Sequence, residues 1–298
     1  MNLTIYRDYP DGLVALGNLV RENGETTFCY NQEYLARTDA AAVSLSLPLR
    51  EKPFSEEELL PYFKGLLPEG EALENLCRSM GILNGDYFTM LGSCGLDCLG
   101  DIVINPYAYQ TERSYEPITV QDLTAMAGKP RSIDASIELA RLSLAGTQNK
   151  CGLFHDPKAP LGDGWYQPVG GAPSNYIIKF AREDLHDLMI VEHLSLTCAA
   201  ACGVPSAKTA LLNPSRPIIC VERYDRLGSA SEVINGQVAP LRQHQEDITQ
   251  AFGIMPEAKY RQLEPNTVTV LADFFRNSSA NPAQDIANLT RLLLFNYL

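Results

Sequence analysis

The residues best suited to chemistry form a short polar loop, residues 143–150, with the sequence SLAGTQNK. The loop holds one glycine, two hydroxyl side chains, two amides and a lysine, all groups that can contact an anion. Two common nucleotide motifs do not fit it. A P-loop needs a second glycine before its lysine and Ser or Thr after it, whereas Asn149 precedes Lys150 and Cys151 follows it. A G-x-G-x-x-G fingerprint is missing as well, so the loop predicts an anion site of another kind.

Three further features follow the loop in a fixed order. Lys179 lies in the β-forming stretch YIIKF, Glu192 lies in a segment of helical period at 184–202, and VERYD, beginning at Val221, ends an apolar strand. This is the order of elements in the N-lobe of a protein kinase, where a strand lysine contacts the α- and β-phosphates of ATP. A glutamate such as Glu192 would hold that lysine in place, and VERYD would offer backbone groups to adenine.

Each of these residues also fits a purely structural role. Lys179 alternates with Ile178 and could be a solvated strand residue, and Glu192 could be a surface charge of its helix. Ser143 and Thr147 could simply cap turns. The order of the features, more than any single residue, favours ATP binding.

The elements that position these residues fall into two regions. In the first hundred residues, LTIY, LVALGNLV and TTFCY read as strands, the capping box Ser55–Glu58 starts a helix, and GDIVINP closes the region as a strand. This predicts an independent α+β unit. Residues 106 to 135 are polar with scattered Pro and Gly and one helix at 119–127, so we place a boundary there.

The second region begins with strands and ends with helices. We expect CGLFHD, GWYQPV and YIIKF to form an antiparallel meander, followed by the 184–202 helix and two more strands, AKTALL and RPIICVERYDR. The remaining segments are helical in period: HQEDITQAFG, VTVLADFFRN and AQDIANLTRLLLFNYL.

Composition limits the function. A formal net charge of -12 argues against a protein that grips nucleic acid over its whole surface, because phosphate contacts need clustered Lys and Arg. No apolar stretch has the length of a signal peptide core at the N-terminus or of a membrane span elsewhere, so we expect a cytoplasmic protein without membrane contact. The eight cysteines include no C-x-x-C pair, and free buried thiols are expected, with no metal site.

Taken together, these stretches resemble the HipA family of bacterial serine/threonine kinase toxins over the whole length of the chain. The matching segments are SLSLPL (44–49), YFKGLLPEG (62–70), GLDCLGD (95–101), SLAGTQNK (143–150), SNYIIK (174–179), VEHLSLTCAAACGVP (191–205), VERYDR (221–226), HQEDITQAFG (244–253) and LLLFNYL (292–298). The resemblance implies an α+β, protein-kinase-like two-lobed fold with an N-terminal α/β subdomain. Its expected divisions are 1–105 for that subdomain, 106–226 for the kinase-like N-lobe with ATP loop and hinge, and 227–298 for the start of an all-helical C-lobe.

The resemblance also assigns roles to single residues. The cofactors it implies are ATP and Mg²⁺. Glu192 is the ion-pair partner of Lys179. The ATP-binding residues it implies are Ser143, Gly146, Thr147, Gln148, Lys150, Lys179, Glu222, Tyr224 and Asp225, with Glu222 and Tyr224 meeting adenine through the backbone and Asp225 taking the ribose hydroxyls. Ser143 matches the serine that such kinases phosphorylate on themselves, and a phosphate there would add close to two negative charges and push the loop out of its site.

In the family, the catalytic aspartate and the two Mg²⁺ ligands follow the segment that LLLFNYL resembles, and this chain ends at Leu298 before them. We therefore expect the chain by itself to contain no catalytic or metal residues and to bind ATP without transferring phosphate. The parent kinase would phosphorylate a protein such as an aminoacyl-tRNA synthetase. Its expected partner is a helix-turn-helix antitoxin of the HipB type, with DNA reached only through that antitoxin. The alternative is a non-catalytic HipA-like scaffold that binds such a DNA-binding partner.

Overall fold

The N-terminal part of the chain is built on a four-stranded antiparallel sheet. The computed structural model describes residues 1–105, 112–128, 150–180, 187–213, 217–228, 232–259 and 266–297. The sheet has the order β3-β2-β1-β4, with β1 at Asn2–Tyr9, β2 at Gly12–Glu22, β3 at Glu25–Tyr30 and β4 at Ile102–Asn105. Asn23 and Gly24, both at positive φ, turn the chain from β2 into β3, as an Asn-Gly hairpin requires. The strands expected in this region are confirmed.

Short helices pack on this sheet and complete its core. They are α1 (Gln32–Leu35), α2 (Glu56–Gly65), α3 (Gly70–Met80), α4 (Tyr87–Cys94) and the 3-10 turn η1 (Gly95–Asp97). The capping box expected at Ser55 and Glu58 is present at the start of α2. Leu16, Phe28 and Phe63 are fully buried in one hydrophobic cluster. Each such side chain contributes roughly 1.5–3 kcal/mol of burial energy.

A six-stranded antiparallel sheet forms the second layer, in the order β5-β7-β6-β8-β10-β9. Its strands are β5 (Ser114–Ile118), β6 (Lys150–His155), β7 (Trp165–Val169), β8 (Tyr176–Phe180), β9 (Thr209–Leu212) and β10 (Ile218–Glu222). Two helices belong to the same region of the chain, α5 (Val120–Gly128) and α7 (Leu188–Ala201). They agree with the helices expected at 119–127 and 184–202. The structure shows α7 from Leu188 onward, whereas residues 181–186 lie outside the described residues.

The expected meander of three strands is wrong in its order. Strand β6 lies between β7 and β8, so the chain does not pass from each strand to its neighbour in the sheet. The physical reason is visible in β6 itself, where Cys151 to His155 are all buried. A strand covered on both faces belongs in the interior of a sheet, while β7, in which Tyr166, Gln167 and Val169 are only partly buried, lies nearer the edge.

The last part of the chain begins with two small β-ribbons, not with helices as expected from residue 227 onward. Strand β11 (Arg226–Leu227) pairs with β14 (Leu241–Arg242), and β12 (Val233–Ile234) pairs with β13 (Gln237–Val238). Asn235 and Gly236 at positive φ make the turn of the second ribbon. The helical elements then follow: α8 (Ile248–Ala251), η2 (Pro256–Ala258), α9 (Thr267–Ser278) and α10 (Pro282–Tyr297).

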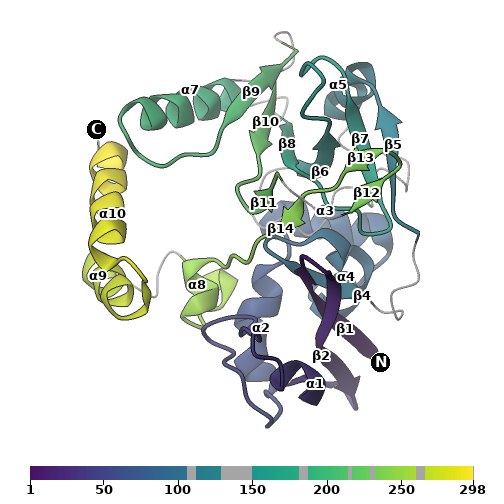
Figure 1. The fold of residues 1–298 in the computed structure, drawn as a ribbon, viewed down its shortest axis with the longest axis vertical. Coiled ribbons are helices and arrows are strands. Elements are labelled where there is room, and N and C mark those ends of the chain that lie inside the picture. The colour runs from purple at the N-terminus through teal and green to yellow at the C-terminus, as the bar shows by residue number, and fades with distance from the viewer. Residues whose placement is uncertain are drawn as a thin grey trace.

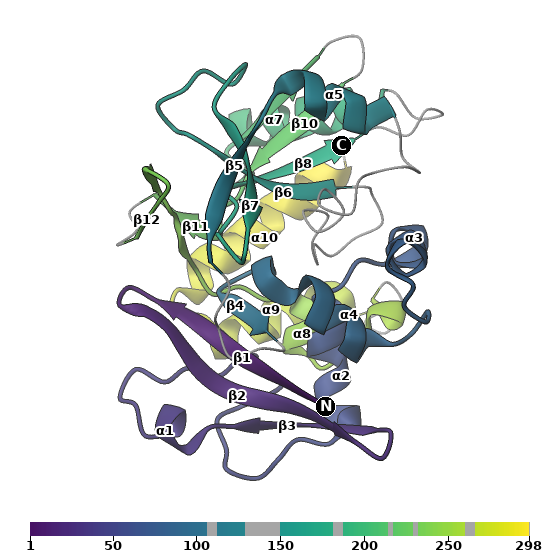
Figure 2. The ribbon, with the colours of Figure 1, turned by 90° about the vertical axis from the view of Figure 1, so that its right-hand side faces the viewer.

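The two sheets lie at opposite ends of the molecule, and the β11–β14 ribbon passes between them (Figure 1). Figure 2 shows β1, β2 and β3 below and the six-stranded sheet above, with α10 behind. Helix α8 packs against α2, because the Gln250 amide donates a 2.8 Å hydrogen bond to the backbone oxygen of Tyr62. The segment after the six-stranded sheet is therefore anchored on the N-terminal unit.

None of the eight cysteines forms a disulfide, as expected, but they are not all buried. Cys77, Cys94, Cys98, Cys151 and Cys220 are buried, Cys29 is intermediate, and Cys198 and Cys202 are exposed on α7. None of the described helices is long and apolar enough to cross a membrane.

Candidate functional site

Lys179 and Glu192 meet between the six-stranded sheet and helix α7. The ammonium of Lys179 on β8 forms an ion pair and hydrogen bond with Glu192 Oε1. Both side chains are about one-fifth exposed, 21% and 20%. A pair that is only partly buried keeps its charges accessible to a ligand, and such pairs contribute only about 0–1 kcal/mol to stability.

Lys150 lies beside this pair. It is the register partner of Lys179 in the antiparallel ladder between β6 and β8, and directly opposite residues of such a ladder project from the same face of the sheet. Burial, together with the neighbouring Lys179, lowers the pKa of Lys150 to about 8, while Glu192 acts in the opposite direction. The two lysines and one glutamate leave an excess positive charge at the start of β6. Ser143, Gly146, Thr147 and Gln148 lie outside the described residues.

The predicted hinge follows β10. The backbone amide of Glu222 donates to the carbonyl of Lys208, and the amide of Arg223 donates to the carbonyl of Asn175. Tyr224 is 73% exposed, and its hydroxyl donates a hydrogen bond to Gln245 Oε1. The turn is thus tied to both neighbouring strands while it presents an aromatic ring to solvent.

Asp225, the next residue, has its carboxylate in the interior, with the residue only 3% exposed. Arg223 donates to both oxygens, from Nε at 3.0 Å and from Nη2 at 2.7 Å. Arg226 Nη1 and the backbone amide of Gly100 also donate to Oδ2, at 2.9 and 2.8 Å. These contacts do not test a role for Asp225 towards a ribose, which stays a prediction.

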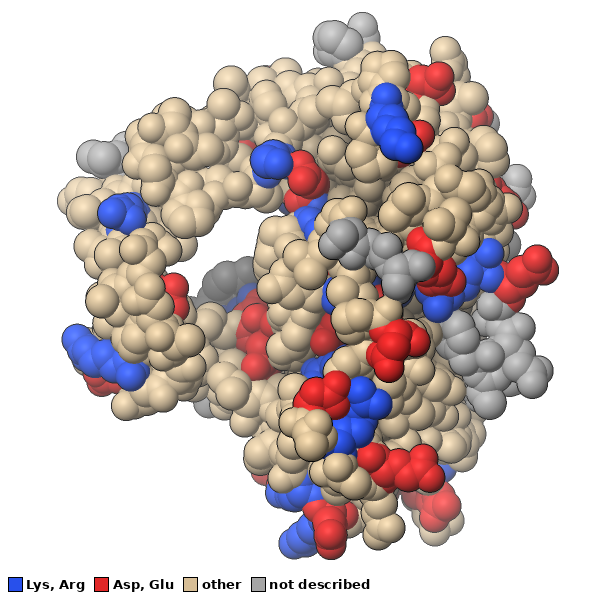
Figure 3. Space-filling model, in the orientation of Figure 1, with Lys and Arg blue, Asp and Glu red and all other residues tan. Residues whose placement is uncertain are grey.

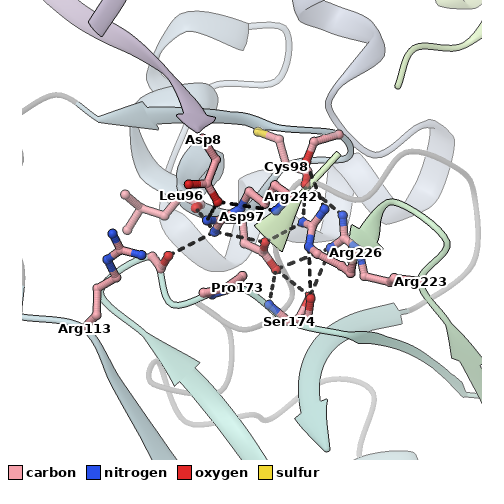
Figure 4. Close-up of polar contacts among 12 residues, drawn as sticks. Asp8, Leu96, Asp97, Cys98, Arg113, Pro173, Ser174, Arg223, Arg226 and Arg242 are labelled. Atoms are coloured by element: carbon pink, nitrogen blue, oxygen red, sulfur yellow. Dashed lines mark hydrogen bonds and ion pairs between the residues drawn. The ribbon is translucent and has the colours of Figure 1, made fainter. Parts of the chain in front are cut away.

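The two hinge arginines continue into a buried ionic cluster centred on Asp97, which we call the Asp97 cluster (Figure 4). Asp97 Oδ1 accepts from Arg226 Nη2 at 2.8 Å and from Arg242 Nη2 at 3.3 Å. Its Oδ2 accepts from the hydroxyl of Ser174 at 2.6 Å and from Arg223 Nη1 at 3.4 Å. Burial would raise the pKa of Asp97, but the three arginines outweigh it and hold the pKa well below its ordinary value.

Sequence reasoning missed the Asp97 cluster, although GLDCLGD and VERYDR were both singled out. Asp97 is separated from its arginine partners by 126 to 145 residues, so no local spacing brings them together. The sequence did contain one signal of such a cluster. Directly after the buried apolar strand β10, the segment Arg223-Tyr224-Asp225-Arg226 places an acid between two bases. Charged residues that continue a buried strand need partners, which a sequence alone does not name.

A strand lysine paired with a glutamate of the following helix is a contact also found in the N-lobe of protein kinases. The family model for the HipA-like C-terminal domain matches residues 142–298, and the model for the HipA N-terminal domain matches residues 12–105. The chain belongs to the HipA family.

Three comparisons define how close this relationship is. The chain is 31% identical to the putative kinase Y4mE of Sinorhizobium fredii over 99% of its own length and 70% of the relative. It is 28% identical to the serine/threonine-protein kinase toxin HipA of Shewanella oneidensis, over 84% of this chain and 56% of that protein. A solved complex of Shewanella oneidensis HipA with HipB and operator DNA superposes with a TM-score of 0.67 at 25% identity, covering 87% of this chain and 57% of that one. The chain thus spans little more than half the length of the Shewanella protein.

Proposed function

We propose that these residues form the ATP-binding part of a HipA-like serine/threonine protein kinase. The observation that carries the proposal is the placement of Lys150 and Lys179 on one face of the sheet, with Glu192 paired to Lys179. Two ammonium groups on the same face of the sheet suit the oxygens of neighbouring phosphates. Residues 143–149 would add backbone N–H groups, and the backbone at Glu222 and Tyr224 would meet the adenine.

Bound ATP would supply the phosphoryl group, and Mg²⁺ would neutralise charge on its phosphates. The positive charges of Lys150 and Lys179 suit the negatively charged phosphates of ATP. Within the described ranges, no three His, Cys, Asp or Glu side chains are grouped so as to hold a metal ion, and we propose no metal ligand among them. The expectation that residues 1–298 alone transfer no phosphate stays a prediction.

Phosphoryl transfer, substrate and partners are proposals for the whole protein, with a protein such as an aminoacyl-tRNA synthetase as substrate. Phosphorylation of Ser143 would act as its off switch.

A HipB-type antitoxin is the proposed partner, with DNA reached only through it, because the neighbouring structure contains HipA, HipB and operator DNA. Acidic side chains spread over the face that carries β14 and the tip of the β1–β2 hairpin, interspersed with basic ones (Figure 3). Such a surface suits a basic DNA-binding protein better than DNA itself.

Calorimetric titration with ATP tests the proposal. We expect Lys179→Met to weaken binding at least about tenfold and to leave the fold intact, since a partly exposed ion pair adds little stability. The matched control is Lys158→Met, an exposed lysine in the turn between β6 and β7, which should bind like the wild type. Equal ATP affinity in the Lys179 variant and the wild type would overturn the assignment.

The alternative is a scaffold that holds a DNA-binding partner without using ATP. The same titration separates the two functions, because a scaffold of this kind would show no ATP binding in the wild type. A Lys179→Met variant that still binds a HipB-type partner would be consistent with both functions, so partner binding alone does not separate them.

A further inference from the structure

The Asp97 cluster joins the N-terminal unit to the hinge through more than one side chain. The backbone oxygen of Cys98 accepts from Nη2 of Arg223 at 2.9 Å and from Nη2 of Arg226 at 3.1 Å. Gly100 donates its amide to Asp225 and accepts from Arg226 Nη1 at 2.9 Å. Three residues, Asp97, Cys98 and Gly100, therefore contact the turn that follows β10, and Figure 4 shows both arginines directed toward Asp97 and Cys98.

The charges of the Asp97 cluster balance when one further residue is counted. Arg242 also contacts Asp8 Oδ2 on β1 at 3.4 Å, so that Arg223, Arg226 and Arg242 face the carboxylates of Asp8, Asp97 and Asp225. The three guanidinium groups are at most 1% exposed. A buried charge without its partner is strongly destabilising, so the arginines hold their positions only while the acids are in place.

We propose that Asp97 is a positioning residue for adenine: it fixes the turn of Arg223 to Arg226 and thereby the hinge backbone at Glu222 and Tyr224. This inference rests on the proposed function, because it takes the hinge as the adenine contact. Asp97 engages both hinge arginines through different oxygens, which fixes the orientation of two rigid guanidinium groups at once. The N-terminal unit is in this way part of the nucleotide site without touching the nucleotide.

The proposal separates two parts of ATP recognition. Asp97 accepts hydrogen bonds from Ser174, Arg223, Arg226 and Arg242, a set separate from the lysines that would bind phosphates, Lys150 and Lys179. Loss of the Asp97 carboxylate should therefore weaken adenine recognition and leave phosphate recognition unchanged. A residue that only stabilised the fold would weaken both alike.

The test compares three ligands, ATP, adenosine and inorganic tripolyphosphate, by calorimetry on the 298-residue chain. We expect Asp97→Asn to weaken ATP and adenosine by the same factor, about tenfold or more, to reduce the preference for ATP over GTP, and to leave tripolyphosphate binding unchanged. The matched control is Asp86→Asn, which breaks the Arg21–Asp86 ion pair within the N-terminal unit and should bind all ligands as the wild type does.

Two further variants keep the test decisive if Asp97→Asn does not fold. Asp97→Asn combined with Arg242→Gln restores the charge balance. Ser174→Ala keeps all charges and removes the 2.6 Å hydrogen bond to Asp97 together with the 3.0 Å hydrogen bond that Ser174 accepts from Arg223. In any folded variant, wild-type adenosine affinity, or an equal loss for tripolyphosphate, would overturn the positioning role. A wild-type chain that binds neither ATP nor tripolyphosphate would instead overturn the proposed function.

Discussion

Lys150 and Lys179 lie directly opposite each other in neighbouring antiparallel strands, and Glu192 forms an ion pair with Lys179. Burial is the main reason why the pKa of Lys150 is lowered to about 8, and the like charge of the neighbouring Lys179 acts in the same direction. Phosphate oxygens supply the negative charge that relieves this repulsion. The lysine pair is therefore most stable in the presence of the ligand that we propose for it.

Polyphosphate binding should depend on pH through Lys150. Its pKa is lowered, so the ammonium is protonated below about pH 8 and neutral above it. Tripolyphosphate affinity should be highest on the acid side of pH 8 and should fall above it by up to about tenfold per pH unit. Titrations from about pH 7.5 to about pH 9.5 would measure this slope. Lys150→Met should remove it, and a slope that persists in that variant would assign the titration to another group.

The carboxylate of Glu192 should set the position of this pH step. Glu192 raises the pKa of Lys150, so Glu192→Gln should move the fall in affinity to lower pH and weaken binding at neutral pH. The control is Glu57→Gln, an exposed acid in the first turn of α2. The same pH titration measures both variants. An unshifted midpoint in Glu192→Gln would show that its carboxylate does not act on Lys150.

Gly152 on β6 should not tolerate a side chain. A Cβ atom there would lie 2.7 Å from Ser174 Oγ, which is held by hydrogen bonds to Asp97 and Arg223 and cannot easily move. Gly152→Ala should lower the free energy of unfolding by about 1–3 kcal/mol, the usual range for overpacking. Gly162→Ala is the control, because nothing lies within 4 Å of the added atom. Urea denaturation measures both, and equal stability would mean that Ser174 is free to move.

Asp97 should contribute stability that is lost in acid. Its pKa is lowered in the folded protein, so the contribution is complete above the ordinary carboxyl pKa, near 3.9, and is lost as pH falls towards the lower folded value. The difference in free energy of unfolding between the wild type and Asp97→Asn should be largest at neutral pH and shrink below about pH 4. Urea denaturation at several pH values tests this. A difference that does not change with pH would show that packing, not charge, is responsible.

The sequence predicted those elements whose signals are local. The capping box at Ser55 and the strand carrying Lys179 each depend on residues close together in the chain, and each is present. The Lys179–Glu192 contact was also anticipated, because the order of elements matches a protein kinase N-lobe, in which a helix glutamate holds the strand lysine. The α+β class and the family follow from the same segments.

Long-range pairing could not be predicted in the same way. The interior place of β6 depends on which strands cover it, and the continuous burial from Cys151 to His155 appears only once the sheet is assembled. The inward position of Asp225 depends likewise on Arg223 and on the Gly100 amide, which is distant in sequence. Charged side chains carry no local sign of whether they face water or a buried partner.

The Asp97 cluster bears on how members of this family can be recombined. The matched ranges 12–105 and 142–298 look like two exchangeable modules, but the second contains Arg223, Arg226 and Arg242 with only one of their three acids. A fragment of residues 142–298 would leave two guanidinium charges unmatched on a surface that is normally interior. Asp97 lies in the first range, whereas Asp8 lies just before it on β1. A chimera that joins the N-terminal segment of one relative, the part before residue 12 included, to the second module of another should fold only if that segment brings acids to the places of Asp8 and Asp97.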